Sequence, residues 1–309
     1  MSIIILAIES SCDDTSAAVS KDAKILANLI AGQKVHELWG GVVPELASRA
    51  HQQNILPVVH AALEQAEISK NELSAVAFTR GPGLIGSLLV GTSFAKAFAL
   101  ALNLPLIEVN HMQAHILAHF IDNKPSFPFL CLTVSGGHTQ IVLVKDFLKM
   151  EVVGETLDDA AGEAFDKVAK LIGLDYPGGP AISRAAESGD VNKYQFPVAN
   201  LGRDSFDFSF SGLKTAVLRQ IQDITGHNPG VIDGKKSYSL DPQVVSDLSA
   251  SFQKAAIGAL IKQTHKAYLQ FKPKTLVVGG GVAANSYLRE KMQDRLNKEL
   301  SQRGSVFGL

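Results

Sequence analysis

Two histidines stand four residues apart directly after a short apolar run at 106–109. They are His111 and His115 in the segment Asn-His-Met-Gln-Ala-His. Residues four apart share one face of a helix, so both imidazoles could bind one metal ion. A wet helix face or a pair of core histidines fits the spacing equally well. The end of a strand in an α/β protein is where sites are usually built, which favours a metal site.

Two neighbours limit this prediction. His119 lies one turn further on, but helical rotation turns it away from a common coordination sphere, so we expect a structural role. Zinc peptidases share the histidine spacing but need a glutamate directly after the first histidine as general base. Met112 occupies that position, so a metalloprotease would lack its base.

Adjacent glycines follow a second apolar run, in the segment 134–139 with the sequence Val-Ser-Gly-Gly-His-Thr. Gly136 and Gly137 let backbone N–H groups approach a phosphate closely, and Ser135 adds a hydroxyl. An ordinary hairpin turn is the alternative interpretation. The segment 9–15 occupies the equivalent place near the amino terminus. It is acidic, which suits an ion or a ribose better than a phosphate alone.

The third segment of interest, the glycine turn Gly279-Gly280-Gly281, follows the apolar run at 275–278 and leads to Asn285. Such a turn permits a flat base or ribose to lie on the backbone, with Asn285 as a hydrogen-bonding side chain or as a helix cap. Two glycine turns and their acidic counterpart at strand ends are typical of the nucleotide cleft of actin-like folds.

The segment 81–86, Gly-Pro-Gly-Leu-Ile-Gly, matches a dinucleotide-binding fingerprint and has Glu108 at the expected distance. It makes a Rossmann-type dehydrogenase an alternative class. Pro82 stiffens this turn, and the fingerprint leaves the histidine pair and the other glycine turns unexplained. We therefore expect these glycines to allow tight packing of a helix.

Predicted strands and helices, which must position these residues, alternate along the chain. Apolar, β-branched runs at 3–8, 75–79, 106–109, 129–134, 140–144 and 275–278 predict strands, and helical spacing covers 44–66, 87–102, 160–172 and 244–269. A strand, a small-residue turn and a second strand occur near the start and again after Pro128. This pattern predicts an α/β fold with a duplicated architecture and a boundary near residue 125, dividing the chain into 1–125 and 126–309.

Composition excludes several classes of protein. The chain of 309 residues is 46% hydrophobic and carries 29 basic against 30 acidic residues, so no global basic field would hold a nucleic acid. DNA binding is not expected, and RNA contacts must come from local patches or partners. Two cysteines are too few for a disulfide framework. The absence of a signal sequence and of long apolar segments predicts a cytoplasmic protein without membrane spans.

The segment 225–241 is rich in Gly, Asn, Lys and Ser and has little periodicity. We expect a solvated surface loop. Lys235 and Lys236 could contact RNA from this loop.

With these residues assembled, the chain resembles the universal tRNA threonylcarbamoyladenosine transferase family, long described as glycoproteases. The resemblance spans residues 3 to about 290, and chance matches in the same order are negligible. It rests on the segments 8–15, 40–51, 81–83, 110–115, 135–139, 162–167, 176–180, 208–215 and 279–285.

The resemblance implies two actin-like lobes with a nucleotide and metal cleft between them. It implies transfer of the threonylcarbamoyl group from threonylcarbamoyl-AMP to N6 of adenosine 37 in tRNAs that read codons beginning with A. His111 and His115 would bind iron or a similar divalent metal. A shorter paralogous subunit and a small ATPase of the same pathway would be partners. The substrate would be held by Val134, Ser135, Gly136, Gly137, His138, Asp166, Gly179 and Asn285.

The chemistry agrees with this reading. An adenine amine is a weak nucleophile, so the carbamoyl carbonyl must be polarised and the phosphate leaving group neutralised, which a metal and inward N–H groups can do. We expect Asp166 to bind the ribose first and to act as general base second. A nucleotide-binding scaffold without turnover and a kinase or ATPase of the same fold are the alternatives.

The family pattern continues beyond the strand expected at Val306 into a Thr-Asp-Asn-Ala segment whose aspartate is the third protein ligand of the metal. This chain ends at Leu309. We therefore expect a C-terminally truncated form without the final strand and helix. Its activity depends on whether that aspartate is dispensable or replaced.

Overall fold

The computed structural model describes residues 2–39, 41–122, 124–226, 230–232, 235–237 and 240–303. The chain forms two compact units, Met1–Asn123 and Lys124–Leu309. The strand expected at Val306 lies outside the described residues.

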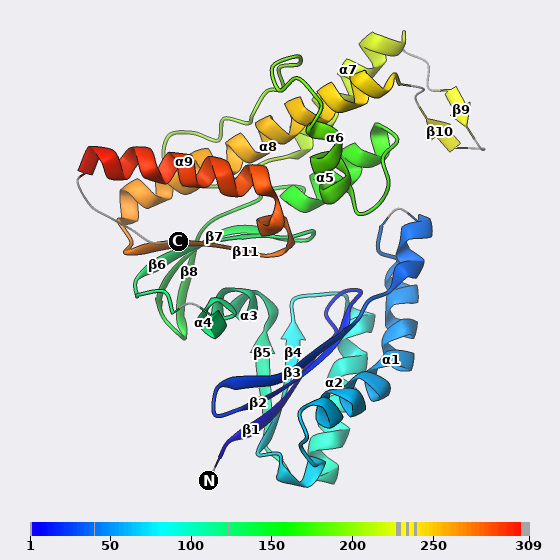
Figure 1. The fold of residues 1–309 in the computed structure, drawn as a ribbon, viewed down its shortest axis with the longest axis vertical. Helices are drawn as coiled ribbons and strands as arrows, with labels where there is room; N and C mark the ends of the chain where they lie inside the picture. The colour runs from blue at the N-terminus through cyan, green and yellow to red at the C-terminus, as the bar shows by residue number, and fades with distance from the viewer. Residues whose placement is uncertain are drawn as a thin grey trace. The chain divides into compact units, whose positions relative to one another are not determined.

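A five-stranded mixed sheet forms the centre of the first unit (Figure 1), in the order β3-β2-β1-β4-β5. Strands β1 (Ile4–Glu9), β2 (Thr15–Lys21) and β3 (Lys24–Ala31) form an antiparallel meander. Strands β4 (Ala75–Gly81) and β5 (Leu106–Asn110) add to β1 in parallel. The carboxyl ends of β1, β4 and β5 therefore meet at one edge of the sheet.

Two helices pack on one face of this sheet, α1 (Pro44–Gln65) against β2 and β3 and α2 (Ile85–Ala101) against β4. Alternation along β1 explains why only one face is covered so tightly: Ile4, Leu6 and Ile8 are buried, whereas the residues between them are half-buried. The short helices α3 (His111–Leu117) and α4 (His119–Asp122) follow β5, and single 3-10 turns span Lys34–Trp39 and Lys70–Glu72.

The second unit repeats the strand pattern. Strands β6 (Phe129–Val134), β7 (Thr139–Asp146) and β8 (Lys149–Glu155) form an antiparallel meander, and β11 (Thr275–Gly279) pairs with β6 in parallel. In both units the parallel strand therefore lies beside the first strand of the meander. Every residue of β6 is buried, as expected for a central strand.

The helices of the second unit are α5 (Ala161–Leu171), α6 (Gly178–Ala186), α7 (Ser211–Thr225), α8 (Pro242–Phe271) and α9 (Ser286–Arg303). A 3-10 turn over Gly281–Ala284 joins β11 to α9. The 30-residue α8 packs against α6, α7 and α9 and is visible as the long helix of Figure 1. Phe165, Phe208, Phe210 and Phe252 are fully buried in the core of this unit.

The predicted strands and long helices are present, with bounds that differ by at most two residues. The strands β3 and β8 were not predicted; each is an edge strand with most side chains at least partly exposed, and neither has a strict alternation of apolar and polar residues. The loop prediction for 225–241 is wrong in part. Strands β9 (Gly230–Ile232) and β10 (Lys235–Ser237) form a hairpin there, because backbone pairing needs no apolar periodicity.

The sheet topology excludes the dinucleotide-binding fold, because three of its five strands form an antiparallel meander. A Cβ atom on Gly83 would lie 2.4 Å from the Ser11 carbonyl oxygen, and one on Gly91 would lie 2.2 Å from Ser10 Oγ. Gly83 therefore allows close packing, as the sequence suggested for the segment 81–86, and Gly91 does the same within α2. No helix in the described ranges has the length and apolar character needed to cross a membrane.

Candidate active site

The predicted histidine pair lies on α3, at the carboxyl edge of the first sheet. Asn110 ends β5 and caps α3, accepting hydrogen bonds from the amides of Met112 (2.9 Å) and Gln113 (3.1 Å). The cap starts the helix at His111, so the four-residue spacing brings the rings together. His111 Nε2 and His115 Nε2 are 3.1 Å apart, and the rings meet edge to face.

Glu9 lies beside this pair and was not among the predicted site residues. Its Oε2 atom is 3.2 Å from His111 Nδ1 and accepts a hydrogen bond of 2.6 Å from Thr79 Oγ1, while the Ser11 amide donates to Oε1. Ser11 Oγ is also 3.2 Å from His111 Nδ1. Burial opposes ionisation of Glu9, but the hydrogen bonds from His111, Ser11 and Thr79 outweigh it and lower its pKa to about 2.

The donor set fits a metal ion. Two metal–nitrogen bonds of about 2.1 Å meeting at about 90–110° place their nitrogens about 3.0–3.4 Å apart, close to the 3.1 Å between the two Nε2 atoms. Histidine ligands usually donate their other N–H to a carboxylate, which is the position of Glu9 relative to His111. A hydrogen bond between two neutral imidazoles gives the same separation, so the carboxylate is the more specific feature.

A third protein ligand is not found in the described part of the chain, where no three His, Cys, Asp or Glu side chains are grouped to hold an ion. His119 begins α4, and its Nε2 atom is buried without a hydrogen-bond partner among the described residues. Burial lowers its pKa, which favours the neutral ring expected of a structural histidine.

A surface hollow of about 450 Å³ adjoins the histidine pair on the sheet face opposite α1 and α2. Small side chains such as Ala7, Ala18 and Ala77 line it, together with Glu9 and His115. The pair is therefore open to a ligand from within its own unit.

The predicted substrate residues lie in the second unit. Val134 ends β6, and the four residues Ser135 to His138 form the turn to β7. The amide of Ser135 donates to the His138 carbonyl (2.8 Å), and the His138 amide donates to Ser135 Oγ (3.1 Å). A Cβ atom added to Gly136 or Gly137 would meet nothing within 4 Å. The glycine turn is thus closed on itself by hydrogen bonds and open on its outer side.

Helix α5 brings this turn close to Asp166. Gly162 and Asp166 lie four residues apart on α5, so they share a face. A Cβ atom on Gly162 would lie 2.5 Å from the Ser135 carbonyl oxygen, and the Gly162 amide donates to that carbonyl (3.2 Å). Only glycine permits this close approach of α5 to the turn.

Asp166 Oδ1 accepts a hydrogen bond of 2.7 Å from the amide of Gly178, the first residue of α6. Burial raises the pKa of Asp166, although the amides of Gly178 and Gly179 act in the opposite direction. Gly179 borders open space, whereas a Cβ atom on Gly178 would lie 2.6 Å from the Asp166 Cα atom. Asp166 therefore orients the amino-terminal turn of α6, and Gly179 lies on its open side.

Asn285 is the residue that caps α9. Its Oδ1 atom accepts from the Leu288 amide (2.9 Å), and its Nδ2 atom donates to Ser183 Oγ and Gln253 Oε1, both at 2.8 Å. These contacts tie α9 to α6 and α8. Of the two interpretations from the sequence, the structure shows the helix cap.

The turn that precedes this cap packs against β6. Gly280 has φ of 91°, and a Cβ atom there would lie 2.4 Å from the Val134 carbonyl oxygen. The structure therefore gathers the β6–β7 turn, α5, the start of α6 and the β11–α9 turn within one unit. The histidine pair belongs to the other unit.

The comparisons with known proteins agree with these features. The sequence model of the tRNA N6-adenosine threonylcarbamoyltransferase family matches residues 24–302. The chain belongs to this family. The relative from Christiangramia forsetii, which carries that name, is 56% identical over 96% of this chain and 85% of its own length. The relative from Riemerella anatipestifer is 54% identical over 96% of this chain and 84% of its own length.

Solved structures support the fold of this family member. Full-length HypF, in a phosphate- and nucleotide-bound form, matches with a TM-score of 0.61 at 15% identity, over 96% of this chain and 51% of HypF. Component A of the (R)-2-hydroxyglutaryl-CoA dehydratase of Acidaminococcus fermentans matches with a TM-score of 0.53 at 14% identity, over 96% and 89%. These neighbours have the actin-like α/β fold that the sequence predicted.

Proposed function

We propose that this chain transfers the threonylcarbamoyl group from threonylcarbamoyl-AMP to N6 of adenosine 37 in tRNAs that read codons beginning with A. The single observation that supports this most strongly is membership of the family over residues 24–302. The open glycine turn of the second unit and the carboxylate-backed histidine pair of the first supply groups that this chemistry requires.

The reaction joins the adenine amine to the carbamoyl carbonyl carbon and breaks the bond from that carbon to the phosphate oxygen. AMP leaves with the electron pair of the broken bond, and the amine loses one proton. The turn at Gly136 and Gly137 is open on the side where a phosphate could accept backbone hydrogen bonds, so we assign it to the adenylate, together with Val134, Ser135 and His138.

Asp166 is assigned to the ribose, with proton uptake from the amine as its second role. Its raised pKa suits a carboxylate that must accept a proton near neutral pH. One of its oxygens is held by the Gly178 amide, which fixes the orientation of the carboxylate for a ligand at Gly179. Asn285 would support the same site from the start of α9, where it holds α6 and α8 in place.

His111 and His115 would hold a divalent metal ion, which we propose to be iron(II). When bound, it would supply Lewis-acid polarisation of a substrate oxygen. Glu9 would receive the Nδ1 proton of His111 as a hydrogen bond and so keep Nε2 as the coordinating atom. Glu9→Gln should retain this geometry but weaken metal binding by about 10- to 100-fold.

The proposal includes tRNA as substrate, a shorter paralogous subunit and a small ATPase as partners, and the cytoplasm as the location. The family to which the chain belongs modifies tRNA by name, which supports the first part. The partner proteins and the location follow from the family resemblance.

The test is transfer to an unmodified tRNA transcript by the purified 309-residue chain, given iron(II), preformed threonylcarbamoyl-AMP and the partner proteins. Mass spectrometry of the digested tRNA should detect the modified adenosine above the level without the chain. His111→Ala with His115→Ala should abolish it. Adenylate binding without any modified adenosine would contradict the proposal and identify a binding scaffold.

A further inference from the structure

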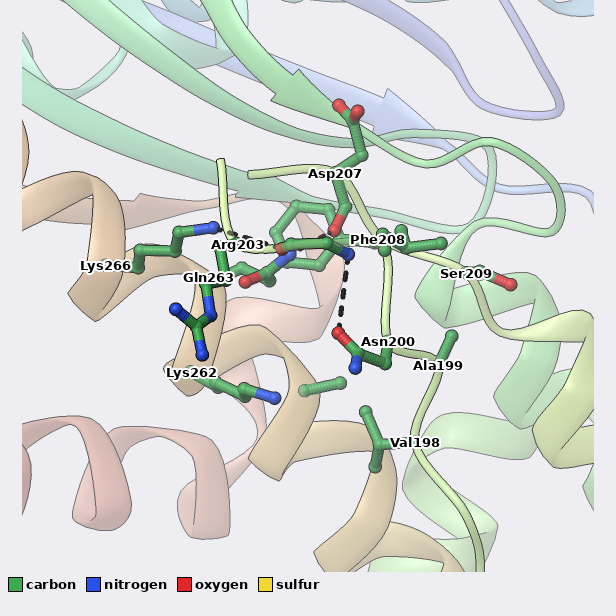
Figure 2. A pocket seen from close by; sticks show the side chains of 13 residues that line it. Val198, Ala199, Asn200, Arg203, Asp207, Phe208, Ser209, Lys262, Gln263 and Lys266 are labelled. Atoms are coloured by element: carbon green, nitrogen blue, oxygen red, sulfur yellow. Dashed lines mark hydrogen bonds between the residues drawn. The ribbon is translucent and has the colours of Figure 1, made fainter. Parts of the chain in front are cut away.

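Three hollows lie along the outward face of α8 in the second unit, apart from the residues assigned to the adenylate. The first, of about 200 Å³, is shown in Figure 2 and includes Lys262 and Lys266 in its lining. The second, of about 530 Å³, lies between α8 and α9, and the third, of about 340 Å³, lies beside residues 192–198. Lys254 and Gly258 line both of these, and Lys262 lines the first and the second.

Basic side chains predominate around these hollows. Whereas the whole chain has 29 basic and 30 acidic residues, the lining of the three hollows has seven basic side chains and two carboxylates, Asp207 and Asp294. The basic residues are Arg203, Lys254, Lys262, Lys266, Lys291, Arg295 and Lys298. We call this set the α8 basic ridge. Positive charge is thus concentrated around these hollows in a protein whose formal net charge is −1.

Within the described part of the chain, the carboxylates near the ridge pair with only one of its cations, Lys291, which also contacts Glu290 at 2.7 Å. Asp207 accepts hydrogen bonds from the Glu155 amide and from Ser205 Oγ, and Asp294 pairs with Lys291 at 3.4 Å. Among the described residues, the side chains of Arg203 and Lys262 have no ion-pair or hydrogen-bond partner. Both are exposed, and both side chains are drawn around the first hollow in Figure 2. Their charges are available to a ligand.

The ridge also has a regular geometry. Lys254, Lys262 and Lys266 are separated by eight and four residues, so they follow a row of i, i+4 positions that winds by about 120° around α8 and extends over about 18 Å. Two of these cations are held in place: Lys254 Nζ donates to Asn192 Oδ1 (2.6 Å), and Lys266 Nζ donates to the Ser205 carbonyl (2.6 Å). An extended polyanion fits a row of this length better than a single phosphate does.

The second hollow adds the α9 residues Arg295 and Lys298 and the ring of Tyr287. Arg295 donates to His265 Nδ1 at 3.1 Å, which fixes its guanidinium beside the row. Lysine and arginine side chains with an interleaved aromatic ring are typical of surfaces that follow a nucleic-acid backbone.

We propose that the α8 basic ridge binds the phosphodiester backbone of the RNA substrate. This inference rests on the proposed function for the identity of the RNA, but the site is separate from the glycine turns and from the histidine pair. The ridge would hold the body of the tRNA through phosphates and contribute no sequence preference.

The experiment measures binding of an unmodified tRNA transcript to the full chain by fluorescence polarisation at several salt concentrations. The variant Arg203→Glu with Lys262→Glu should bind on the order of tenfold or more weakly. The slope of log affinity against log salt should become shallower by about 1.5, because two phosphate contacts are lost. Arg203→Ala with Lys262→Ala should show the same loss of slope without added repulsion.

The matched control is Lys24→Glu with Lys149→Glu, which changes the net charge equally at two exposed strand positions outside the three hollows. The control should retain the affinity and slope of the unchanged chain within about twofold. Equal weakening by the control and the ridge variant, or no tRNA binding by the unchanged chain, would overturn the inference. A ridge variant that still binds tRNA but no longer binds an acidic protein would overturn it too, because the ridge would then be a protein-binding surface.

Transfer kinetics separate this inference from the proposed function. The ridge variant should raise KM for tRNA and leave kcat unchanged, because the ridge residues do not touch the residues assigned to the reacting groups. If the unchanged chain binds tRNA through the ridge but transfers nothing, the proposed function fails and the ridge stands.

Discussion

The carboxylate of Glu9 ends β1 and meets His111 across 102 positions of sequence. Strand order explains this contact: β1, β4 and β5 are parallel neighbours, so their carboxyl ends bring Glu9, Thr79 and the start of α3 to one edge. The histidine spacing alone predicted the pair. In the sequence Glu9 was only one residue of the acidic segment 9–15. Its contact with His111 could not be predicted, because no local pattern indicates which strands pair.

Two adjacent glycines at the start of α6 provide a test of the open substrate turn. Gly179→Ala should fold like the unchanged chain and lose adenylate affinity, since its Cβ atom would enter open space where the ligand is expected. Gly178→Ala should instead destabilise the protein by about 1–3 kcal/mol, because its Cβ atom would lie 2.6 Å from backbone of α5.

Thermal unfolding and isothermal titration with a non-hydrolysable adenylate would measure both effects. Unchanged adenylate affinity in a folded Gly179→Ala variant would remove the start of α6 from the substrate site.

The raised pKa of Asp166 predicts how the free energy of unfolding depends on pH. Its pKa is raised in the folded chain, so the folded state holds the proton more tightly than the unfolded state does. The free energy of unfolding should therefore gain from Asp166 at low pH and lose that gain as pH rises from about 4 through the raised pKa. Asp166→Asn cannot ionise, so its stability relative to the unchanged chain should increase over that range.

Urea unfolding at pH 4, 5, 6 and 7 would show this divergence, with Asp204→Asn as a control for removing an exposed carboxylate. Parallel stability curves for Asp166→Asn and the unchanged chain would contradict the direction of the pKa shift.

At the scale of elements, the start of α7 depends on a carboxylate from another segment. Asp158 accepts hydrogen bonds from Ser209 Oγ (2.5 Å) and from the amides of Phe210 (2.7 Å) and Ser211 (3.3 Å). These contacts do the work of an N-cap for a helix whose own cap residue is Phe210. The arrangement connects the loop before α5 to the buried Phe208 and Phe210.

Asp158→Ala should therefore cost about 1–2 kcal/mol of stability, more than a typical exposed aspartate. The expected shift of the melting temperature is about 2–8 °C, which differential scanning calorimetry would measure. Asp204→Ala is the matched control, and an equal shift in both variants would argue against the cap.

The elements that the sequence predicted are those with strong periodicity or long apolar runs, such as β6 and α8. Helix α6 was not predicted, because its opening Gly-Gly-Pro is ordinarily a turn signal. Its first amide is instead held by Asp166, a contact from α5 that no local pattern contains. Tertiary contact therefore decided an element that local propensity disfavoured.

At the scale of the whole molecule, the two groups of site residues belong to different units with separate cores. Their binding functions should be separable. His111→Ala with His115→Ala should lose bound metal and keep adenosine affinity within about twofold, because the glycine turns are held by contacts inside the second unit. Gly179→Ala, at the position assigned to the ribose, should show the reverse.

Metal content by mass spectrometry and adenosine binding by calorimetry would test this separation, with adenosine chosen because it has no phosphate. A large loss of adenosine affinity in the histidine variant would show that the two groups form one inseparable site. Transfer activity should require both groups.

The sequence by itself determined the chemistry of this protein: the family, the α/β class, the paired histidines and the glycine turns. These are local patterns, set by helical spacing and by glycine conformation. Only the tertiary structure decided that Glu9 supports His111 and that Asn285 is a cap. It also decided that lysines of α8, Arg203 of a distant loop and residues of α9 form one basic ridge. These depend on which elements pack together, and packing depends on contacts between residues far apart in the chain.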